Sequence, residues 1–129
     1  MKNSIIEYYN KGGKLIAECG GMMYLSKNII NAEGEKFPML SILDIDCTME
    51  DMKLKLGYRK IRINETIYYG HEFHYSKIVN SGEKDLNLEI FSARDKKLDT
   101  KIFRKNNFLA SYIHFYWADS NFIETIFEL

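Results

Sequence analysis

The feature that most constrains this chain is the segment of residues 14–25, where a short apolar run ends at Cys19 and two glycines follow. The apolar run predicts a strand, and the residues after Gly21 have helical spacing. The segment therefore predicts a strand, a sharp turn and a helix, with Cys19 on the turn. This order of elements indicates an α/β fold with a nucleophile elbow.

A cysteine on such a turn can act as a nucleophile. Unpaired N–H groups and the positive dipole end at a helix N-terminus are expected to stabilise the thiolate of Cys19. Gly20 and Gly21 lack Cβ atoms, so a substrate carbonyl can approach the N–H of Gly20. The alternative is that Cys19 is an inert core residue, because free cysteines are often buried.

The composition excludes several classes of protein. A chain of 129 residues with 46% hydrophobic residues fits one globular domain over residues 1–129. The 18 basic and 18 acidic residues are scattered, which argues against nucleic acid as a partner. No segment reaches membrane-spanning length or resembles a signal peptide, so we expect no membrane and a cytoplasmic protein. The two cysteines, Cys19 and Cys47, are expected to be thiols.

The apolar pattern predicts alternating helices and strands along the whole chain. Helices are expected at residues 4–11, after the glycines with Met22, Met23, Leu25, Ile29 and Ile30, and at 121–128 with Asn121 and Glu124 as a cap pair. Strands are expected at residues 14–18, 40–43, 54–63, 67–79, 88–92, 101–104 and 108–113.

His114 is the best-placed candidate for the base that a cysteine nucleophile needs. It follows the strand 108–113, at the sheet edge where the elbow also lies, although a surface histidine is an equal alternative. His71 and His74 have HxxH spacing, but on a strand they point to opposite faces, so no metal site is expected. Glu18 and Glu72 are each expected to position a base, bind a substrate amine or remain solvated.

Three segments, taken together, resemble one protein family. They are residues 17–25, residues 57–59 with 70–76, and residues 110–114. In this order they resemble the glutamine amidotransferase domain of cobyrinic acid a,c-diamide synthases, the cobalamin branch of the class I glutaminases. The resemblance covers essentially the whole chain. It implies a partial flavodoxin-like α/β domain with the elbow strand near the centre of its sheet.

The resemblance also implies roles for individual residues. Cys19 would attack the side-chain amide of glutamine and release ammonia, with His114 raising its nucleophilicity. Residues expected to bind substrate are Glu18, Gly20, Gly21, His71, Glu72 and His74. The ammonia would pass to an ATP-dependent synthetase domain or chain, which would use ATP and Mg to amidate the a and c acetates of a corrin precursor. This chain has no phosphate-binding loop, so no cofactor is expected in it. Sirohydrochlorin a,c-diamide synthases share the motifs, so both tetrapyrroles stay open.

Two departures from the family pattern qualify these expectations. Many class I glutaminases have an acid two residues after the histidine, whereas Tyr116 stands there in this chain. The family pattern also includes an earlier glycine-rich loop that supplies a second oxyanion donor, and loss of one donor costs roughly 10²- to 10³-fold in rate. The alternatives are therefore an inactive or assembly-only fragment, or a cell-wall amidating glutaminase, which residues 70–76 disfavour. Without the earlier strands of the family pattern we also expect an apolar sheet edge, which a second copy of the chain in a homo-oligomer or another segment would cover.

Overall fold

The computed structural model describes residues 1–118 and 121–129, which form three helices and twelve strands. The helices are α1 (Lys2–Asn10), α2 (Gly20–Leu25) and α3 (Phe122–Glu128). The strands are β1 (Leu15–Glu18), β2 (Asn28–Ile30), β3 (Lys36–Pro38), β4 (Asp46–Thr48), β5 (Lys55–Ile63), β6 (Thr66–His74), β7 (Lys77–Val79), β8 (Glu89–Ser92), β9 (Lys97–Leu98), β10 (Ile102–Lys105), β11 (Phe108–Ser111) and β12 (His114–Phe115).

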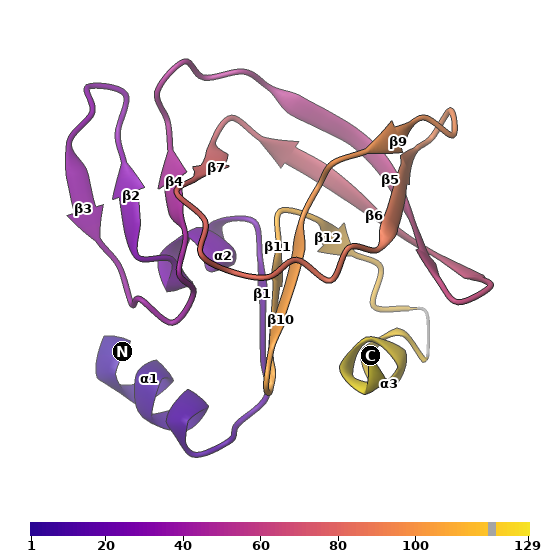
Figure 1. Cartoon of the computed structure of the whole chain (residues 1–129), viewed down its shortest axis with the longest axis horizontal. Coiled ribbons are helices and arrows are strands. Elements are labelled where there is room, and N and C mark those ends of the chain that lie inside the picture. Colours follow the sequence, from indigo (N-terminus) through magenta and orange to yellow (C-terminus); the bar gives the residue numbers. More distant parts are fainter. Residues whose placement is uncertain (119–120) are drawn as a thin grey trace.

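The strands form three small sheets, which gives the chain a mixed α/β architecture (Figure 1). Their strand orders are β1-β11-β10, β12-β6-β5-β8-β9 and β3-β2-β4-β7. The pairs β1–β11 and β2–β4 are parallel. The expectation that the strand before Cys19 lies near the centre of its sheet is wrong for the described residues, because β1 pairs only with β11 and forms the edge.

The β1-β11-β10 sheet is apolar on both faces because alternate residues of β11 enter two different cores. Phe108 and Ala110 belong to one core, which α1 covers, and Leu109 belongs to the other, which contains Phe122 and Ile126 of α3. Figure 1 accordingly shows α1 and α3 on opposite sides of these strands. Both faces are therefore buried, and the ends of β1 and β11 can carry polar functional residues.

The alternation predicted for residues 54–63 is confirmed by β5. Arg59, Ile61 and Ile63 are buried, whereas Leu56 and Tyr58 on the other face are exposed. The hairpin to β6 turns at Asn64, which has a φ of 57°. The predicted positions of α1, β1, β8, β10 and α3 are also confirmed to within two residues.

The helix after Cys19 is shorter than predicted. It ends at Leu25, and Ile29 and Ile30 lie on strand β2 instead. The hydroxyl of buried Ser26 donates to the carbonyl of Met23 at 2.6 Å, so a side chain competes with the next helical turn. The chain then pairs with β4, and this tertiary pairing outweighs the helical spacing of the two isoleucines.

The predicted strand at residues 40–43 is also wrong. The backbone N–H groups of Leu40 and Leu43 donate to the carbonyls of Tyr24 and Leu25 at the C-terminus of α2. These carbonyls have no partner within the helix, so the segment satisfies them and does not join a sheet. Its apolar side chains are buried in the core that contains Met22.

Two further predicted strands are interrupted at serines, and the helix cap predicted at Asn121 does not form. The strand predicted at 67–79 divides into β6 and β7 around Ser76. The strand predicted at 108–113 ends at Ser111, whose hydroxyl accepts the N–H of Ile113 and thereby turns the chain toward β12. Asn121 makes no side-chain cap bond, because its Oδ1 accepts the hydroxyl of Tyr68.

Candidate active site

Cys19 lies on the turn between β1 and α2 in a strained backbone conformation. Its φ is 51° and its ψ is −111°, which falls outside the ordinary helical and extended regions. Such a conformation costs a non-glycine residue on the order of 1–3 kcal/mol and is concentrated at functional sites. The Cys19 N–H donates to the carbonyl of Ser111 at 2.8 Å, which ties the turn to the end of β11.

The thiol of Cys19 is half-buried against the end of β6. Its Sγ lies 3.8 Å from the carbonyl oxygen of Phe73. Burial raises the pKa of the Cys19 thiol, an effect opposed by the N–H of Gly20 and increased by the negative charge of Glu72. Burial therefore outweighs the expected stabilisation of the thiolate, because it removes water from the thiol.

His114 lies at the same end of the β1–β11 pair as Cys19. It begins β12, three residues after Ser111, and pairs with His71 of β6. The two imidazole rings are stacked, with centroids 4.9 Å apart and an interplanar angle of 18°. Gly70 allows the backbone of His114 to lie close to β6, since a Cβ at residue 70 would be 2.6 Å from the carbonyl oxygen of His114.

Glu18 is the last residue of β1 and directly precedes Cys19. Its Oε2 lies 3.4 Å from Nδ1 of His114, and its side chain is 16% exposed against 40% for the histidine. Burial raises the pKa of the Glu18 carboxyl, opposed by hydrogen bonds from the Phe115 N–H and Trp117 and by the charge of His71. The structure therefore brings Glu18, Cys19, His71 and His114 to one edge.

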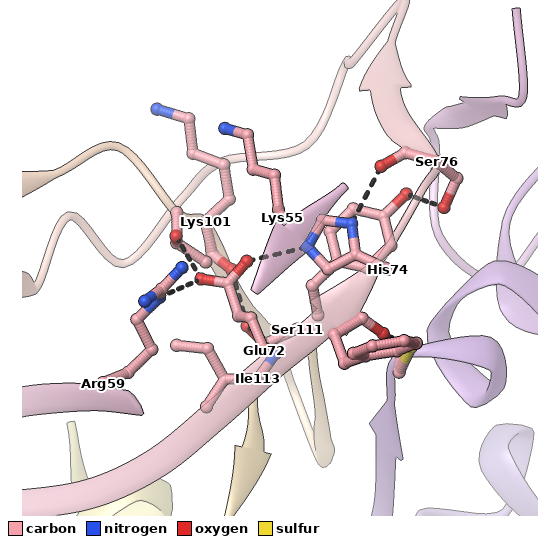
Figure 2. Close-up of polar contacts among 12 residues, drawn as sticks. Lys55, Arg59, Glu72, His74, Ser76, Lys101, Ser111 and Ile113 are labelled. Atoms are coloured by element: carbon pink, nitrogen blue, oxygen red, sulfur yellow. Dashed lines mark hydrogen bonds and ion pairs between the residues drawn. The ribbon is translucent and has the colours of Figure 1, made fainter. Parts of the chain in front are cut away.

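Glu72 and His74 lie on the other face of β6 from His71, as the alternation predicts, and form a buried polar cluster (Figure 2). Glu72 accepts hydrogen bonds from Nε of Arg59 at 2.8 Å and from the hydroxyl of Thr100 at 2.5 Å. Its second oxygen lies 2.7 Å from Nε2 of His74, whose Nδ1 lies 2.8 Å from the carbonyl of Ser76. Since both ring nitrogens face acceptors, the two bonds together require a proton on each.

This buried cluster borders a cavity of about 510 Å³. The lining includes Glu72, His74, Ser76 and Tyr112, with Lys55 and Lys101 among the charged residues. The His74 ring stacks on Tyr112 at 3.7 Å, and the Tyr112 hydroxyl lies 2.8 Å from that of Ser76. Glu72 and His74 are thus held by protein groups while facing a space in which a small ligand fits.

The partners that hold these residues in place were not among the predicted site residues. Arg59 carried a signal, because a charged residue on the inward face of β5 beside Ile61 predicts a buried ion pair. Gly57 allows the Arg59 side chain to lie close to the strand, since a Cβ there would be 2.7 Å from its Nη1. Trp117 and Thr100 stand outside any periodic pattern, so nothing in the sequence indicated their contacts with Glu18 and Glu72.

The described residues, 1–118 and 121–129, do not include two other kinds of feature. They contain no group of three or more His, Cys, Asp or Glu side chains arranged to hold a metal ion. Within the same residues, none of the helices has the length and apolar run needed to cross a membrane.

The sequence is similar to a known family of domains and to several known proteins. The family of CobB/CobQ-like glutamine amidotransferase domains matches residues 1–122. Cobyrinate a,c-diamide synthase of Leptospira interrogans is 37% identical over 131 residues, covering 93% of this chain and 29% of that protein. The enzyme of the same name from Saccharolobus solfataricus is 38% identical over 118 residues, covering 84% and 26%.

A third relative differs in the name of its tetrapyrrole. Hydrogenobyrinate a,c-diamide synthase of Rhizobium meliloti is 29% identical over 108 residues, covering 80% of this chain and 25% of that protein. The chain thus spans less than a third of the length of these relatives. The similarity concerns their glutamine amidotransferase portion.

Proposed function

This chain belongs to the family of CobB/CobQ-like glutamine amidotransferase domains, and from that premise we propose that it hydrolyses glutamine at Cys19 and supplies the ammonia to a synthetase. The observation that carries the proposal is the strained Cys19 turn at the same edge as His114. The turn serves as the nucleophile elbow of a partial flavodoxin-like domain.

The proposed reaction starts from the protonated thiol. Because burial raises the pKa of Cys19, its proton must be removed as the sulfur attacks, and His114 is the proposed acceptor. A bond forms between Sγ and the side-chain carbonyl carbon of glutamine, and the C–N bond then breaks as His114 returns the proton to the leaving ammonia. Water next attacks the thioester, releasing glutamate and restoring the thiol. The N–H of Gly20 is the proposed donor to the oxyanion.

The remaining residues are assigned to glutamine recognition in this proposal. Gly21 keeps the turn open, and His71 lies beside the base. Glu72 and His74 line the cavity beyond β6, from which they can bind a polar group of the substrate or the product. In the whole enzyme, the ammonia would be used by an ATP- and Mg-dependent synthetase part to amidate the a and c carboxylates of cobyrinate or a related tetrapyrrole.

The test is release of glutamate from glutamine by this chain and by variants at the two central residues. Cys19→Ser and His114→Ala are each expected to lower kcat by roughly 10³-fold or more, because nucleophile and base act as a unit. Cys47→Ser is the matched control, since Cys47 is a buried residue of strand β4 and not part of the turn. Turnover that survives in Cys19→Ser would refute the assignment. A glutamine-analogue electrophile should add covalently to Cys19 and leave Cys47 free.

A further inference from the structure

We propose that Glu18 is the positioning residue for His114, a function that in many related glutaminases falls to an acid two residues after the histidine. The inference rests on the proposed function, because it assigns His114 as the base. Tyr116 occupies the later position here and has no carboxylate. Among the residues that the structure describes, Glu18 is the one acidic side chain in ion-pair contact with His114.

The geometry identifies the ring atom of His114 that faces Glu18. Oε2 of Glu18 lies 3.4 Å from Nδ1 of His114, so the carboxylate can accept the Nδ1 proton. The ring then keeps its lone pair on Nε2, the atom needed to accept the thiol proton. A distance of 3.4 Å is long for a hydrogen bond, as is common in active sites without substrate, where contacts tighten on binding.

The carboxylate of Glu18 is itself held in place. The N–H of Phe115 and the side chain of Trp117 act to lower the pKa of this carboxyl against the effect of burial, and His114 lies in ion-pair contact with it. Phe115 is the residue next to His114, so the carboxylate of Glu18 faces both the ring and the backbone of the short strand β12. Only 16% of its side chain is exposed. With these contacts and this burial, little of the carboxylate is accessible to a substrate amine.

The ring of His114 has a second contact that restricts it. His71 stacks against it, and the register of β6 and β12 places these two residues directly opposite each other. Glu72, the other acidic candidate, faces the opposite side of β6 and is bonded to Arg59, His74 and Thr100. The two carboxylates therefore have separate tasks, and Glu18 is the one that fixes the histidine tautomer.

Two measurements test the inference: the tautomer of His114, read by NMR, and the kinetics of glutamine hydrolysis. ¹⁵N chemical shifts of labelled histidine report which ring nitrogen carries the proton, and the His114→Gln variant assigns the signal. We expect the Nδ1–H form in the wild-type chain and a mixture or the Nε2–H form in Glu18→Ala. Glu65→Gln, at the exposed turn between β5 and β6, is the matched control and should leave the signal unchanged.

Kinetics separate positioning from substrate binding. Glu18→Ala is expected to lower kcat by roughly 10²-fold with KM changed less than about twofold, and Glu18→Asp to recover part of the loss. A raised KM with unchanged kcat would instead make Glu18 a substrate ligand and overturn the inference. An unchanged tautomer in Glu18→Ala would overturn it too. The tautomer can be read without turnover, so a wild-type chain that fails to hydrolyse glutamine would refute the proposed function alone.

Discussion

Nε of Arg59 lies 2.8 Å from Oε1 of Glu72, and both side chains are almost completely buried, at 9% and 1% exposed. This ion pair joins the adjacent strands β5 and β6 and holds Glu72, which lines the cavity together with His74. A buried carboxylate is tolerated only where cations and hydrogen bonds replace water. The pair therefore explains why a charged residue stands on the isoleucine face of β5.

Removal of Arg59 should strongly destabilise the fold. Arg59→Met leaves the Glu72 charge without its guanidinium, and breaking a buried pair typically costs about 3–5 kcal/mol. Arg62→Met is the control on the same strand, because the Arg62–Glu89 pair is half exposed and such pairs contribute about 0–1 kcal/mol. Urea unfolding followed by circular dichroism measures both. Equal losses in the two variants would contradict the buried role of Arg59.

Stability should fall in acid because of Glu72. Burial alone would raise its pKa, but hydrogen bonds from His74, Thr100 and Arg59, with the Arg59 charge, lower it to about 2 from 4.5. A lowered folded-state pKa stabilises the fold above pH 4.5, and this contribution, of roughly 3 kcal/mol, is lost between pH 4.5 and 2. Glu72→Gln should flatten this part of the profile of unfolding free energy against pH. An equally steep profile in the variant would assign the acid sensitivity to other carboxyls.

The two thiols should differ in reactivity. Cys47 is fully buried, and burial raises its pKa to about 11, whereas Cys19 is partly exposed at the turn. Iodoacetamide should therefore modify Cys19 at least about tenfold faster than Cys47 in the folded chain. Because burial also raises the pKa of Cys19, its rate should climb with pH beyond 9. Mass spectrometry of peptides gives both rates, and denaturant should equalise them.

Substitution of Gly70 should separate β12 from β6. A Cβ at this position would lie 2.6 Å from both the carbonyl oxygen of His114 and Cγ2 of Ile113. Gly70→Ala is expected to cost roughly 1–3 kcal/mol of stability and to displace His114, with loss of turnover. Gly21→Ala is the stability control, because its Cβ would make an ordinary 3.7 Å contact with Ala17. A Gly70→Ala chain as stable as wild type would argue against this packing.

The strands with strong alternation, and the residues at their ends, could be predicted from the sequence. The inward face of β5 and the common edge of Cys19 and His114 followed from side-chain period and from the direction of parallel strands. The prediction failed where a short apolar run fits both the helical and the strand period, as at Ile29 and Ile30, because pairing with β4 decides that case. Among the partners of Glu72, Thr100 could not be predicted, since it comes from a loop whose position depends on the whole fold.

A substitution at Gly20 should impair catalysis without impairing the fold. A Cβ at Gly20 would have no heavy atom within 4 Å, and its φ lies outside the left-handed region, so neither packing nor backbone conformation requires glycine there. If the carbonyl of glutamine approaches the N–H of Gly20, however, an added methyl group would lie beside the substrate and displace it.

Gly20→Ala is therefore expected to keep or slightly increase the unfolding free energy, because alanine favours the first turn of α2. The same variant should lower kcat/KM for glutamine by roughly 10- to 100-fold, since small displacements of a reacting group have effects of this size. Thermal unfolding and glutamate release, measured on one preparation, give both quantities. Undiminished kcat/KM in a stable Gly20→Ala chain would place the substrate carbonyl elsewhere and remove the Gly20 N–H from the proposed oxyanion site.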